Sequence, residues 1–551
     1  MNLPAAPTLR LGPVFTVALF IAWASALTAA PGDRTRVTIV ATTDLHGNIF
    51  PFDYYTQRPA NVGLAKAATL IAQARKDDPQ LVLIDSGDTI QGTPLAYYHS
   101  RKNNTPPDPM MLAMSALKFD AMAIGNHEYN FGLGVFEKAR REASFPWLSA
   151  NTFRVGTEET AFAPYLIKEV NGARVGIVGL TTPGVPSWEN PENFAGLEFR
   201  DPVAAARKWV AHLRATEKVD VVVVAMHMGL ELDLVTGRPS PGQVPLENAA
   251  FAIATRVPGI DVIAMGHTHR EVPSLVVNGA LLAQAGRWGD CIMRADVHLE
   301  KDAGDRWRVV SKASRTIPVT EQTPADPAIL ALAEPYHVET QAWLGKVVGR
   351  SSVELTAHDA AFGDNALVDL VHRVQLDAGK ADVSLAASFN ARARIPAGAV
   401  TVRDIAGLYI YENTLVVVEA TGAQLKAALE HSARYFRAYE AGKTAAELID
   451  PGIPGYNFDI AEGVAYALDL RQPFGSRVVD LKYRGEPLDP AKKLRVAINN
   501  YRLNGGGGYA MFKDCPVVAR SSAEIRDLII DWVERNGAVP EKPTGNWRLL
   551  P

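Results

Sequence analysis

The sequence predicts an α/β protein with two domains, on three observations. The chain has 551 residues, which is more than a single hydrophobic core usually holds. Between about residues 36 and 320, short apolar runs alternate with stretches of helical composition, such as residues 63–76 and 202–216. This alternation is typical of a largely buried sheet flanked by helices. A polar, proline-bearing stretch at residues 317–327 then interrupts the pattern and predicts a domain boundary.

The chain is therefore divided into four expected segments. Residues 1–30 are expected to form a signal peptide, 31–322 the first domain, 323–347 a connecting helix and 348–551 the second domain. The helix is predicted because residues 328–347 are rich in Ala, Leu and Glu. In the second domain, residues 415–419 predict a strand and residues 423–434 a helix, with Thr421 and Gly422 in the turn between them.

The N-terminus has the features of an export signal. Residues 11–27 carry no charge, Arg10 is the only basic residue before them, and Ala24-Ser25-Ala26 fits a small-x-small cleavage pattern. A membrane anchor is the alternative, but the apolar stretch is short for a span and is interrupted by Pro13. We expect a periplasmic or secreted protein with no stable membrane association after cleavage.

Composition and charge exclude several classes of partner. The net charge is −4, with 47% hydrophobic and 21% charged residues, as in ordinary soluble proteins. This balance does not attract nucleic-acid polymers or anionic membranes, so an anionic ligand must be held locally by metals or a few arginines. Cys291 and Cys515 are the two cysteines, and we expect two separate buried thiols rather than a disulfide.

Five short polar clusters each follow an apolar run in the first domain. Runs of this length predict strands covered on both faces, and ligand-binding side chains of α/β sheets lie at strand ends. Five of the twelve histidines fall in these clusters, a concentration that favours a functional site. The runs are residues 37–40, 81–84, 121–124, 221–224 and 262–265, and the clusters are Asp44-Leu45-His46, Gly87-Asp88, Gly125-Asn126-His127-Glu128, Met226-His227 and Gly266-His267-Thr268-His269.

The side chains in these clusters suit two divalent metal ions. Mixed nitrogen and oxygen ligands favour Mn, Fe, Co or Zn over Mg or Ca, whose sites are rich in oxygen. Two metals about 3.5–4 Å apart suit phosphoester hydrolysis, because they acidify a bound water and neutralise phosphoryl charge. The candidate ligands are Asp44, His46, Asp88, Asn126, His227, His267 and His269.

Taken in order, the clusters resemble the calcineurin-like metallophosphoesterases, and more narrowly the secreted bacterial nucleotidases that add a C-terminal nucleotide-binding domain. The resemblance implies a calcineurin-like sheet-and-helix core followed by an α/β substrate-binding domain. It also implies two metal sites that share Asp88. By this likeness, Asp44, His46, Asp88 and His269 bind one metal, and Asp88, Asn126, His227 and His267 bind the other.

His127 matches the catalytic histidine of this family, which is not a metal ligand. Its expected role is a proton donor or hydrogen-bonding cation that faces the leaving oxygen. A residue that only orients its neighbours is the alternative. In 5′-nucleotidases the position of Asn130 is commonly an aspartate paired with this histidine, so the resemblance implies a weaker pairing here.

Three stretches resemble the 2′,3′-cyclic-nucleotide phosphodiesterase/3′-nucleotidase branch of the family. They are residues 42–55, 87–95 and 125–132, the last of which contains Asn130. Gly47 is a small departure, because that branch often has serine at this position. The similarity extends through nearly the whole chain after the predicted signal, which implies both domains of the family.

In the second domain the resemblance implies four substrate-binding residues. Arg392, in the loop of residues 388–398, matches the arginine that meets the substrate phosphate, and Arg394 is its competitor. A solvated surface position is the alternative for either arginine. Arginine suits this position because its planar fork binds two phosphate oxygens. Tyr411 and Tyr501 match two aromatics that clamp the base, with Asn413 near its edge. Packing in the core is the alternative for each tyrosine.

Gly507, within a run of four glycines from Gly505 to Gly508, bears on the substrate. A flexible turn is the alternative explanation of the run, but glycines also allow close approach to a ligand. In 5′-nucleotidases an aspartate at the position of Gly507 typically contacts the ribose hydroxyls. A ribose whose 2′ and 3′ oxygens carry the phosphate does not need that acceptor.

The expected function is therefore an exported two-metal hydrolase of nucleotide phosphoesters. The resemblance favours a 2′,3′-cyclic-nucleotide 2′-phosphodiesterase with 3′-nucleotidase activity. A 5′-nucleotidase or UDP-sugar hydrolase is the alternative, and a non-catalytic nucleotide-binding surface protein is a more distant one.

Overall fold

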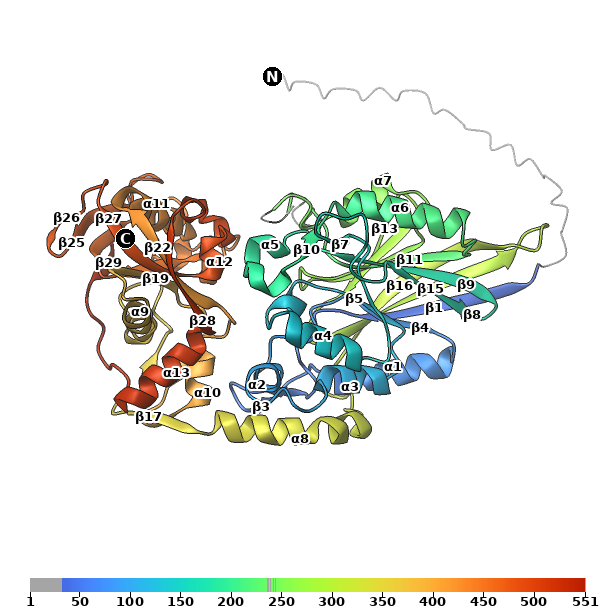
Figure 1. Ribbon diagram of the computed structural model, residues 1–551, viewed down its shortest axis with the longest axis horizontal. Coiled ribbons are helices and arrows are strands. Elements are labelled where there is room, and N and C mark those ends of the chain that lie inside the picture. The colour runs from blue at the N-terminus through green and yellow to red at the C-terminus, as the bar shows by residue number, and fades with distance from the viewer. Residues whose placement is uncertain (1–31, 235–236, 238, 241, 243, 551) are drawn as a thin grey trace, which may run out of the picture.

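The computed structural model describes residues 32–234, 237, 239–240, 242 and 244–550, which form two α/β domains joined by a long helix (Figure 1). The predicted signal peptide, residues 1–30, lies outside the described residues. Among the described residues, no helix has both the length and the apolar character needed to span a bilayer.

The first domain is a sandwich of two sheets, each with six strands in the described part of the chain. In the first sheet β1, β4, β5 and β6 are parallel, and β15 and β16 continue it in antiparallel fashion. In the second, β9, β11, β12 and β14 are parallel, with antiparallel β8 and β13 at the edges. The spatial order in the first sheet is β16 (Trp307–Pro318), β15 (Cys291–Lys301), β1 (Arg34–Thr42), β4 (Val82–Asp85), β5 (Ala121–Ala123) and β6 (Trp147–Leu148). The order in the second sheet is β13 (Glu271–Val277), β14 (Ala280–Ala285), β12 (Val262–Met265), β11 (Val221–His227), β9 (Ala173–Thr181) and β8 (Tyr165–Val170).

The central strands are apolar throughout because both of their faces are covered. Alternate side chains of a strand point to opposite faces. In β1, Val37 and Ile39 enter the core between the two sheets, whereas Val40 packs under the helices of the outer layer. The prediction of strands buried on both faces is therefore confirmed. The outer helices are α1 (Leu64–Asp77), α3 (Pro109–Ala116) and α4 (Leu133–Glu142) over the first sheet, and α6 (Pro202–Ala215) and α7 (Ala250–Arg256) over the second.

Helix α8 (Pro327–Leu344) runs along one side of the first domain and leads to the second (Figure 1). It is shorter than the predicted stretch because Asp326 caps its first turn, accepting hydrogen bonds from the N–H groups of Ala328 and Ile329, and because Gly345 ends it. Strand β17 (Val347–Ser351) follows and pairs with β21 (Gly398–Thr401).

The second domain is built on a five-stranded sheet within the described residues, in the order β23-β19-β27-β22-β28. Strand β22 shows how both faces are covered: Val417 packs towards α9 and α13, and Val418 towards α11. A smaller sheet, β26-β25-β24-β29, packs beside it. The elements are β19 (Val383–Ala387), β22 (Thr414–Thr421), β23 (Asp459–Glu462), β27 (Lys493–Asn499), β28 (Val517–Glu524), β24 (Ala465–Asp469), β25 (Val478–Tyr483), β26 (Glu486–Pro487), β29 (Trp547–Leu550), α9 (Ala366–Gly379), α10 (Val402–Leu408), α11 (Gly422–Ser432), α12 (Asn500–Leu503) and α13 (Ile525–Asn536).

The strand and helix predicted at residues 415–419 and 423–434 are present as β22 and α11. No separate turn divides them. Thr421 ends the strand and caps the helix through a capping box with Gln424, so the chain changes direction without a loop. Cys291 and Cys515 are both buried and free, as expected.

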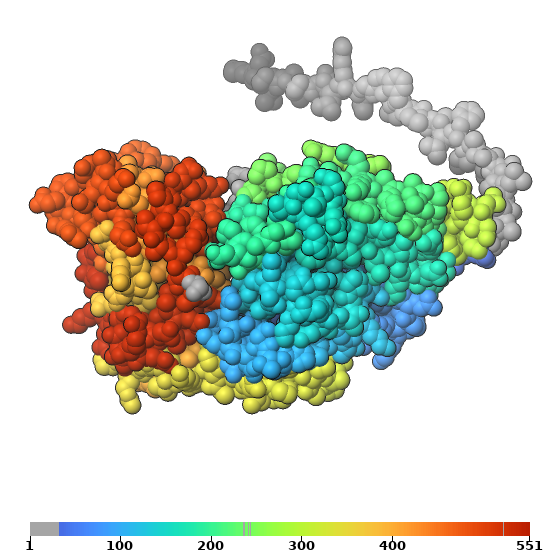
Figure 2. Space-filling view, viewed as in Figure 1, coloured from blue at the N-terminus to red at the C-terminus, as the bar shows by residue number. Residues whose placement is uncertain are grey.

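The two domains are in direct contact (Figure 2). Arg101 pairs with Glu524 at 2.9 Å, and Arg403 donates to the backbone carbonyl of Tyr54 at 2.7 Å. A buried pair within the second domain, Arg526 and Glu412, meets the first domain at Tyr97 and Gln91. Ion-pair, hydrogen-bond and cation–π contacts therefore all join the two domains.

Candidate active site

The five polar clusters meet at one end of the sandwich because each follows a parallel strand. Strands β1, β4 and β5 belong to the first sheet, and β11 and β12 to the second. Two hydrogen bonds tie the sheets together at this end. Ser86 donates its hydroxyl to the carbonyl of Ala264 at 3.1 Å, and His227 donates Nδ1–H to the carbonyl of Ser86 at 2.8 Å. Residues far apart in the sequence are thereby brought together.

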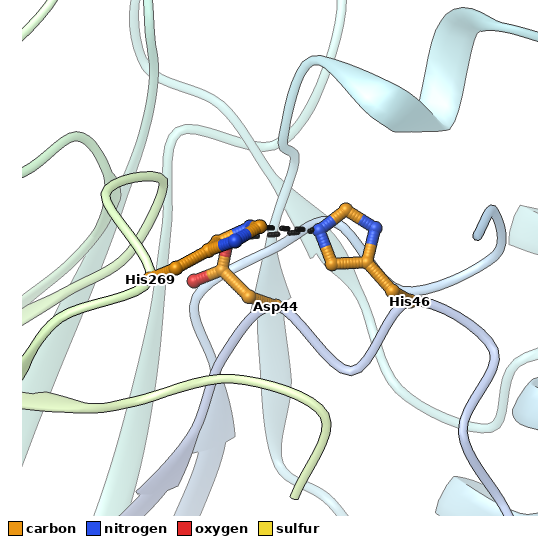
Figure 3. Close-up of side chains that lie close together, drawn as sticks. All are labelled: Asp44, His46 and His269. Atoms are coloured by element: carbon orange, nitrogen blue, oxygen red, sulfur yellow. Dashed lines mark hydrogen bonds and ion pairs between the residues drawn. The ribbon is translucent and has the colours of Figure 1, made fainter. Parts of the chain in front are cut away.

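One group of candidate ligands consists of Asp44, His46 and His269 (Figure 3). The Nε2 atoms of His46 and His269 lie 3.0 Å apart, and Asp44 Oδ1 lies 3.3 Å from His269 Nε2 and 4.0 Å from His46 Nε2. Metal–ligand bonds of about 2.0–2.2 Å place neighbouring donor atoms at such separations. The three donors therefore converge on a volume that suits one cation.

The tautomer of His46 is fixed by Gln91. His46 Nδ1 lies 3.1 Å from the backbone carbonyl and 3.2 Å from the side-chain oxygen of Gln91, both of which only accept hydrogen bonds. Nδ1 must therefore carry the hydrogen, and Nε2 offers its lone pair to the site. Burial lowers the pKa of His46 to about 4, which keeps the ring neutral at neutral pH.

The second group consists of Asp88, His227 and His267. His227 Nε2 lies 2.9 Å from Asp88 Oδ2, and the same oxygen is 3.9 Å from His46 Nε2 in the first group. Asp88 thus lies between the two groups, as a shared ligand must. Glu247 lies 3.2 Å from His267 Nε2, which leaves Nδ1 of that ring as the available ligand atom.

Two buried side-chain atoms lack a hydrogen-bond partner among the described residues: Nε2 of His227, in this second group, and Oδ1 of Asn126, another predicted ligand. His227 Nδ1 donates its hydrogen to Ser86, so in a neutral ring the lone pair of Nε2 would face the negative Asp88 carboxylate. This arrangement favours a positive charge at Nε2: burial acts to lower the pKa of His227, but Asp88 raises it to about 10. A divalent cation between His227 and Asp88 would supply that charge in place of a proton, and it would also give the Asn126 oxygen a partner.

Five of the seven predicted ligands have a positive φ angle, and none of the five is glycine. They are Asp44 (50°), His46 (46°), Asp88 (60°), His267 (74°) and His269 (55°). Such backbone is uncommon for residues with a side chain and is found where function requires a special geometry. Here the turns at the strand ends aim the side chains inward.

Glu128 holds the loops around Asp88 in place and is not part of either ligand group. Its buried carboxylate accepts hydrogen bonds from the backbone N–H groups of Asp88 at 3.0 Å, Thr89 at 2.5 Å and Gly125 at 2.7 Å. Burial raises the pKa of Glu128. The loop after β4 and the loop after β5 are joined through this one side chain.

His127 stands beside the second group and is the more exposed of the histidines near Asp88. Its Nε2 lies 3.9 Å from Asp88 Oδ2, and Asn130 Oδ1 accepts a hydrogen bond from Nδ1 at 2.5 Å. Burial acts to lower the pKa of His127, but Asp88 and then the bond to Asn130 outweigh burial and raise it. Asn130 therefore does contact the ring, but through a neutral amide oxygen, and the weaker pairing expected from the sequence stays a prediction.

Tyr411 and Tyr501, predicted to clamp the base, form one aromatic cluster with Tyr456. The rings of Tyr411 and Tyr456 meet edge to face with their centroids 6.1 Å apart. Burial raises the pKa of Tyr411, and the nearby hydroxyl groups of Tyr456 and Tyr501 raise it further. Gly506 packs on the ring of Tyr501. Tyr411 and Tyr501 are both partly exposed, whereas Tyr409 is fully buried. The partly exposed pair suits a ligand better than a core role.

The remaining predicted substrate residues occupy less constrained positions. Arg392 is exposed and makes no side-chain ion pair among the described residues, whereas Arg394 pairs with Glu354 at 3.0 Å. This difference favours Arg392 over Arg394 as a residue available to a ligand. Asn413 donates to the hydroxyl of Tyr409 at 3.4 Å.

Gly507 occupies a position where a side chain would strain the backbone and displace two neighbouring side chains. Its φ is 70°, and an added Cβ would lie 2.3 Å from Asn457 Oδ1 and 2.6 Å from Arg502 Nη1. The absence of an aspartate at this position is therefore built into the packing of the loop. An aspartate could act here only if these two neighbouring side chains moved.

Four residues that the structure places at the site were not predicted from the sequence. Gln91 lies within the stretch 87–95 already singled out, so its side chain could have been found there. Glu247, Glu189 and Tyr456 stand outside any recognisable motif. Their partners His267, Asn130 and Tyr411 are distant in the chain, and only the folded structure brings them together.

Comparison with known proteins agrees with this architecture. Residues 37–271 match the family described as calcineurin-like phosphoesterase, and residues 347–514 match the family described as 5′-nucleotidase, C-terminal domain. The chain is 32% identical to a Haemophilus influenzae protein named 2′,3′-cyclic-nucleotide 2′-phosphodiesterase/3′-nucleotidase, covering 93% of this chain and 87% of that one.

Two further relatives share the same plan. The trifunctional nucleotide phosphoesterase protein YfkN of Bacillus subtilis is 30% identical over 95% of this chain, but this chain spans only 39% of that longer protein. A Staphylococcus aureus structure solved with α-ketoglutarate, and provisionally described as a 5′-nucleotidase, is 27% identical. Its TM-score is 0.83, with 94% of this chain and 100% of that one covered.

The fold and the convergent ligand groups define a metallophosphoesterase. More narrowly, the chain belongs to the calcineurin-like phosphoesterases that carry a 5′-nucleotidase C-terminal domain, and it is a metal-dependent phosphoester hydrolase.

Proposed function

We propose that this protein is an exported two-metal hydrolase that opens 2′,3′-cyclic nucleotides and then removes the phosphate from the resulting 3′-nucleotides. In this proposal the domains are residues 31–322 and 348–551, joined by the helix segment 323–347. The position of Asp88 carries the proposal, because its carboxylate lies within 4 Å of imidazoles from both ligand groups. The proposed ligands are Asp44, His46, Asp88 and His269 for one metal, and Asp88, Asn126, His227 and His267 for the other.

When bound, two divalent ions would supply a water of lowered pKa and neutralise charge on the phosphoryl oxygens. The protein residues around them provide orientation and proton transfer. His127, held through Nδ1 by Asn130, presents Nε2 on the side of Asp88 and would donate a proton to the departing ribose oxygen. Arg392 would hold phosphate oxygens, and Tyr411 and Tyr501 the base, with Asn413 at its edge.

Three observations support the cyclic and 3′ substrates over 5′-nucleotides. The Haemophilus influenzae relative has that name at 32% identity over most of both chains. Asn130 stands where an aspartate is common in 5′-nucleotidases, and Gly507, with a φ of 70°, stands where those enzymes typically have the aspartate that contacts the ribose hydroxyls. A cyclic phosphate already occupies both of those oxygens.

The decisive test is a comparison of initial rates on 2′,3′-cyclic AMP, 3′-AMP and 5′-AMP with the Mn²⁺-loaded protein. We expect the first two to be turned over faster than 5′-AMP, with 3′-AMP accumulating before adenosine. An Asp88→Ala preparation purified in parallel controls for contaminating phosphatases. Faster turnover of 5′-AMP would refute the substrate assignment while leaving the metal chemistry intact.

The alternative function is a 5′-nucleotidase that also splits nucleotide sugars. The similarity to the Staphylococcus aureus structure favours it, and the same three rates, extended to UDP-glucose, decide between the two. A non-catalytic nucleotide-binding protein would be inactive on every phosphoester in this series even with metal bound.

Export is part of the proposal and has a separate test. Tagged protein expressed from its full gene is expected in the periplasm or medium, shortened by the predicted residues 1–30. Retention of the full-length chain in the membrane fraction would favour the anchor instead.

A further inference from the structure

His127 is the first of three side chains linked by hydrogen bonds that lead away from the metal site. Asn130 Oδ1 lies 2.5 Å from His127 Nδ1, and Asn130 Nδ2 donates to Glu189 Oε2 at 2.5 Å. Glu189 is 5% exposed and comes from a different segment, 59 positions further along the chain. A buried carboxylate is therefore one amide away from the imidazole.

The acceptors and donors in this arrangement fix every orientation. Glu189 Oε1 already accepts from the backbone N–H of Asn190 at 2.6 Å and from Asn193 Nδ2 at 2.9 Å. Both carboxylate oxygens thus act as acceptors, so the amide of Asn130 must turn its nitrogen towards Glu189 and its oxygen towards His127. That oxygen in turn requires the hydrogen of His127 on Nδ1, which leaves Nε2 facing the site.

The segment that carries Glu189 is anchored on both sides. Helix α5 (Val185–Trp188) precedes Glu189, and the ring of Trp188 stacks on His267 with centroids 5.4 Å apart. On the other side, Asn504 donates to the carbonyl of Glu189, and Asn500 to the carbonyl of Trp188, each at 3.4 Å. Asn500 begins helix α12, which bears Tyr501. Glu189 is therefore fixed relative to the metal site and to the second domain.

We propose that Glu189 is a positioning residue for His127, acting through the amide of Asn130 as a neutral bridge. This inference rests on the proposed role of His127 as the group that assists the leaving oxygen. The Nδ1–H of the imidazole needs a hydrogen-bond acceptor of fixed orientation. An aspartate in direct contact can provide that acceptor, and so can an asparagine whose amide is oriented by a carboxylate behind it. Here the acceptor is an amide oxygen, and Glu189 sets which end of the amide faces the ring.

Glu189→Gln tests this logic at nearly constant size. The glutamine oxygen stays with Asn190 and Asn193, so its NH₂ faces Asn130, and the Asn130 amide must turn over. Its NH₂ then opposes the Nδ1–H of His127, and the ring loses its orienting bond. We expect kcat on 2′,3′-cyclic AMP and 3′-AMP to fall about 10–100-fold, as for other outer hydrogen-bond partners of site histidines, with KM little changed.

Bis(p-nitrophenyl) phosphate separates positioning from general damage, because its leaving group departs without a proton. The activity of Glu189→Gln on this diester and its bound metal content are expected to match wild type. Glu192→Gln is the matched control, since Glu192 is exposed on the next turn of the same segment and the change in charge is identical. This control should retain wild-type rates on every substrate.

A second substitution provides the reciprocal test. Asn130→Asp alone places two carboxylates against each other and is expected to lower kcat. Combined with Glu189→Gln, the new carboxylate accepts from both His127 and the glutamine NH₂, so the double variant should recover to within about threefold of wild type. This recovery is not expected if Glu189 only stabilises the fold.

The inference is refuted if Glu189→Gln behaves like Glu192→Gln on nucleotides, if it slows the diester equally, or if Asn130→Asp alone is as active as wild type. The last outcome is measurable even if Glu189→Gln fails to fold. Failure of the proposed function looks different, because the wild-type protein itself would then leave the cyclic and 3′ substrates unhydrolysed.

Discussion

The ring of Tyr501 can be displaced without changing the tyrosine itself. Gly506 packs against it so closely that an alanine Cβ would lie 2.5 Å from Cδ2 and Cε2 and 2.6 Å from Cζ. Ordinary carbon–carbon contacts are about 3.5–4.0 Å, so Gly506→Ala must push the ring by about 1 Å. The φ of Gly506 is not in the left-handed region, and the backbone should therefore tolerate alanine.

The size of the effect follows from the proposed stacking role. Removing one base–aromatic stack costs about 1–3 kcal/mol, and a shift of about 1 Å forfeits about a quarter to a half of a contact. We expect KM for 2′,3′-cyclic AMP to rise about 2–10-fold in Gly506→Ala and about 5–150-fold in Tyr501→Ala, with kcat nearly unchanged.

Steady-state kinetics on 2′,3′-cyclic AMP and bis(p-nitrophenyl) phosphate measure this effect, because the diester has no base to stack. Gly363→Ala is the matched control: it lies in the same domain, an added Cβ meets nothing within 4 Å, and its φ is unremarkable. Unchanged nucleotide KM in both Gly506→Ala and Tyr501→Ala would refute the stacking role. So would equal damage on the two substrates.

Three further outcomes are expected. Asp88→Ala should lose activity and, by elemental analysis, bound metal, because the Asp88 carboxylate lies within 4 Å of imidazoles from both ligand groups; full metal occupancy would contradict the shared-ligand role. His127→Ala should keep its metal and lose about 10²–10⁴ in kcat on nucleotides, whereas loss of metal would make His127 a ligand. Burial lowers the pKa of His372 to about 3, below the unfolded value of about 6.5. Between these two values the unfolded chain binds a proton that the folded protein does not, so stability should fall as pH decreases below about 6.5. Between about pH 6.5 and 4.5 the loss of unfolding free energy from His372 amounts to about 2–3 kcal/mol. Urea titrations over this pH range should show that His372→Phe lacks this loss. Identical pH profiles of the variant and the wild type would show that His372 is not responsible.

Much of the metal site could be predicted because its signals are local. Each candidate ligand follows an apolar run or lies at its end, as Asp44 follows β1 and His267 follows β12. A buried strand needs apolar residues on both faces, and the first polar residues after it mark its end. Residue types and their order along the chain were therefore enough to indicate the chemistry.

The proposed substrate side was harder to predict because its residues carry no local signal: Tyr411 lies between two elements, and Tyr501 lies in the short helix α12. Tyr411 and Tyr501 were found only through resemblance, and nothing in the flanking sequence distinguishes them from buried Tyr409. Tyr456, which joins the same cluster, has no local signal. Which loop aromatics are exposed depends on how the loops pack, and that packing is a long-range property of the fold.

The sequence by itself determined the class of fold, the metal-binding chemistry and the family. Only the tertiary structure decided how the candidate site residues are held: Gln91 contacts His46, Glu247 contacts His267, and Glu189 contacts Asn130. The physical reason is that a hydrogen bond depends on the position of both partners. Glu189 and Asn130 are 59 residues apart, so the bond between them exists only once the chain has folded.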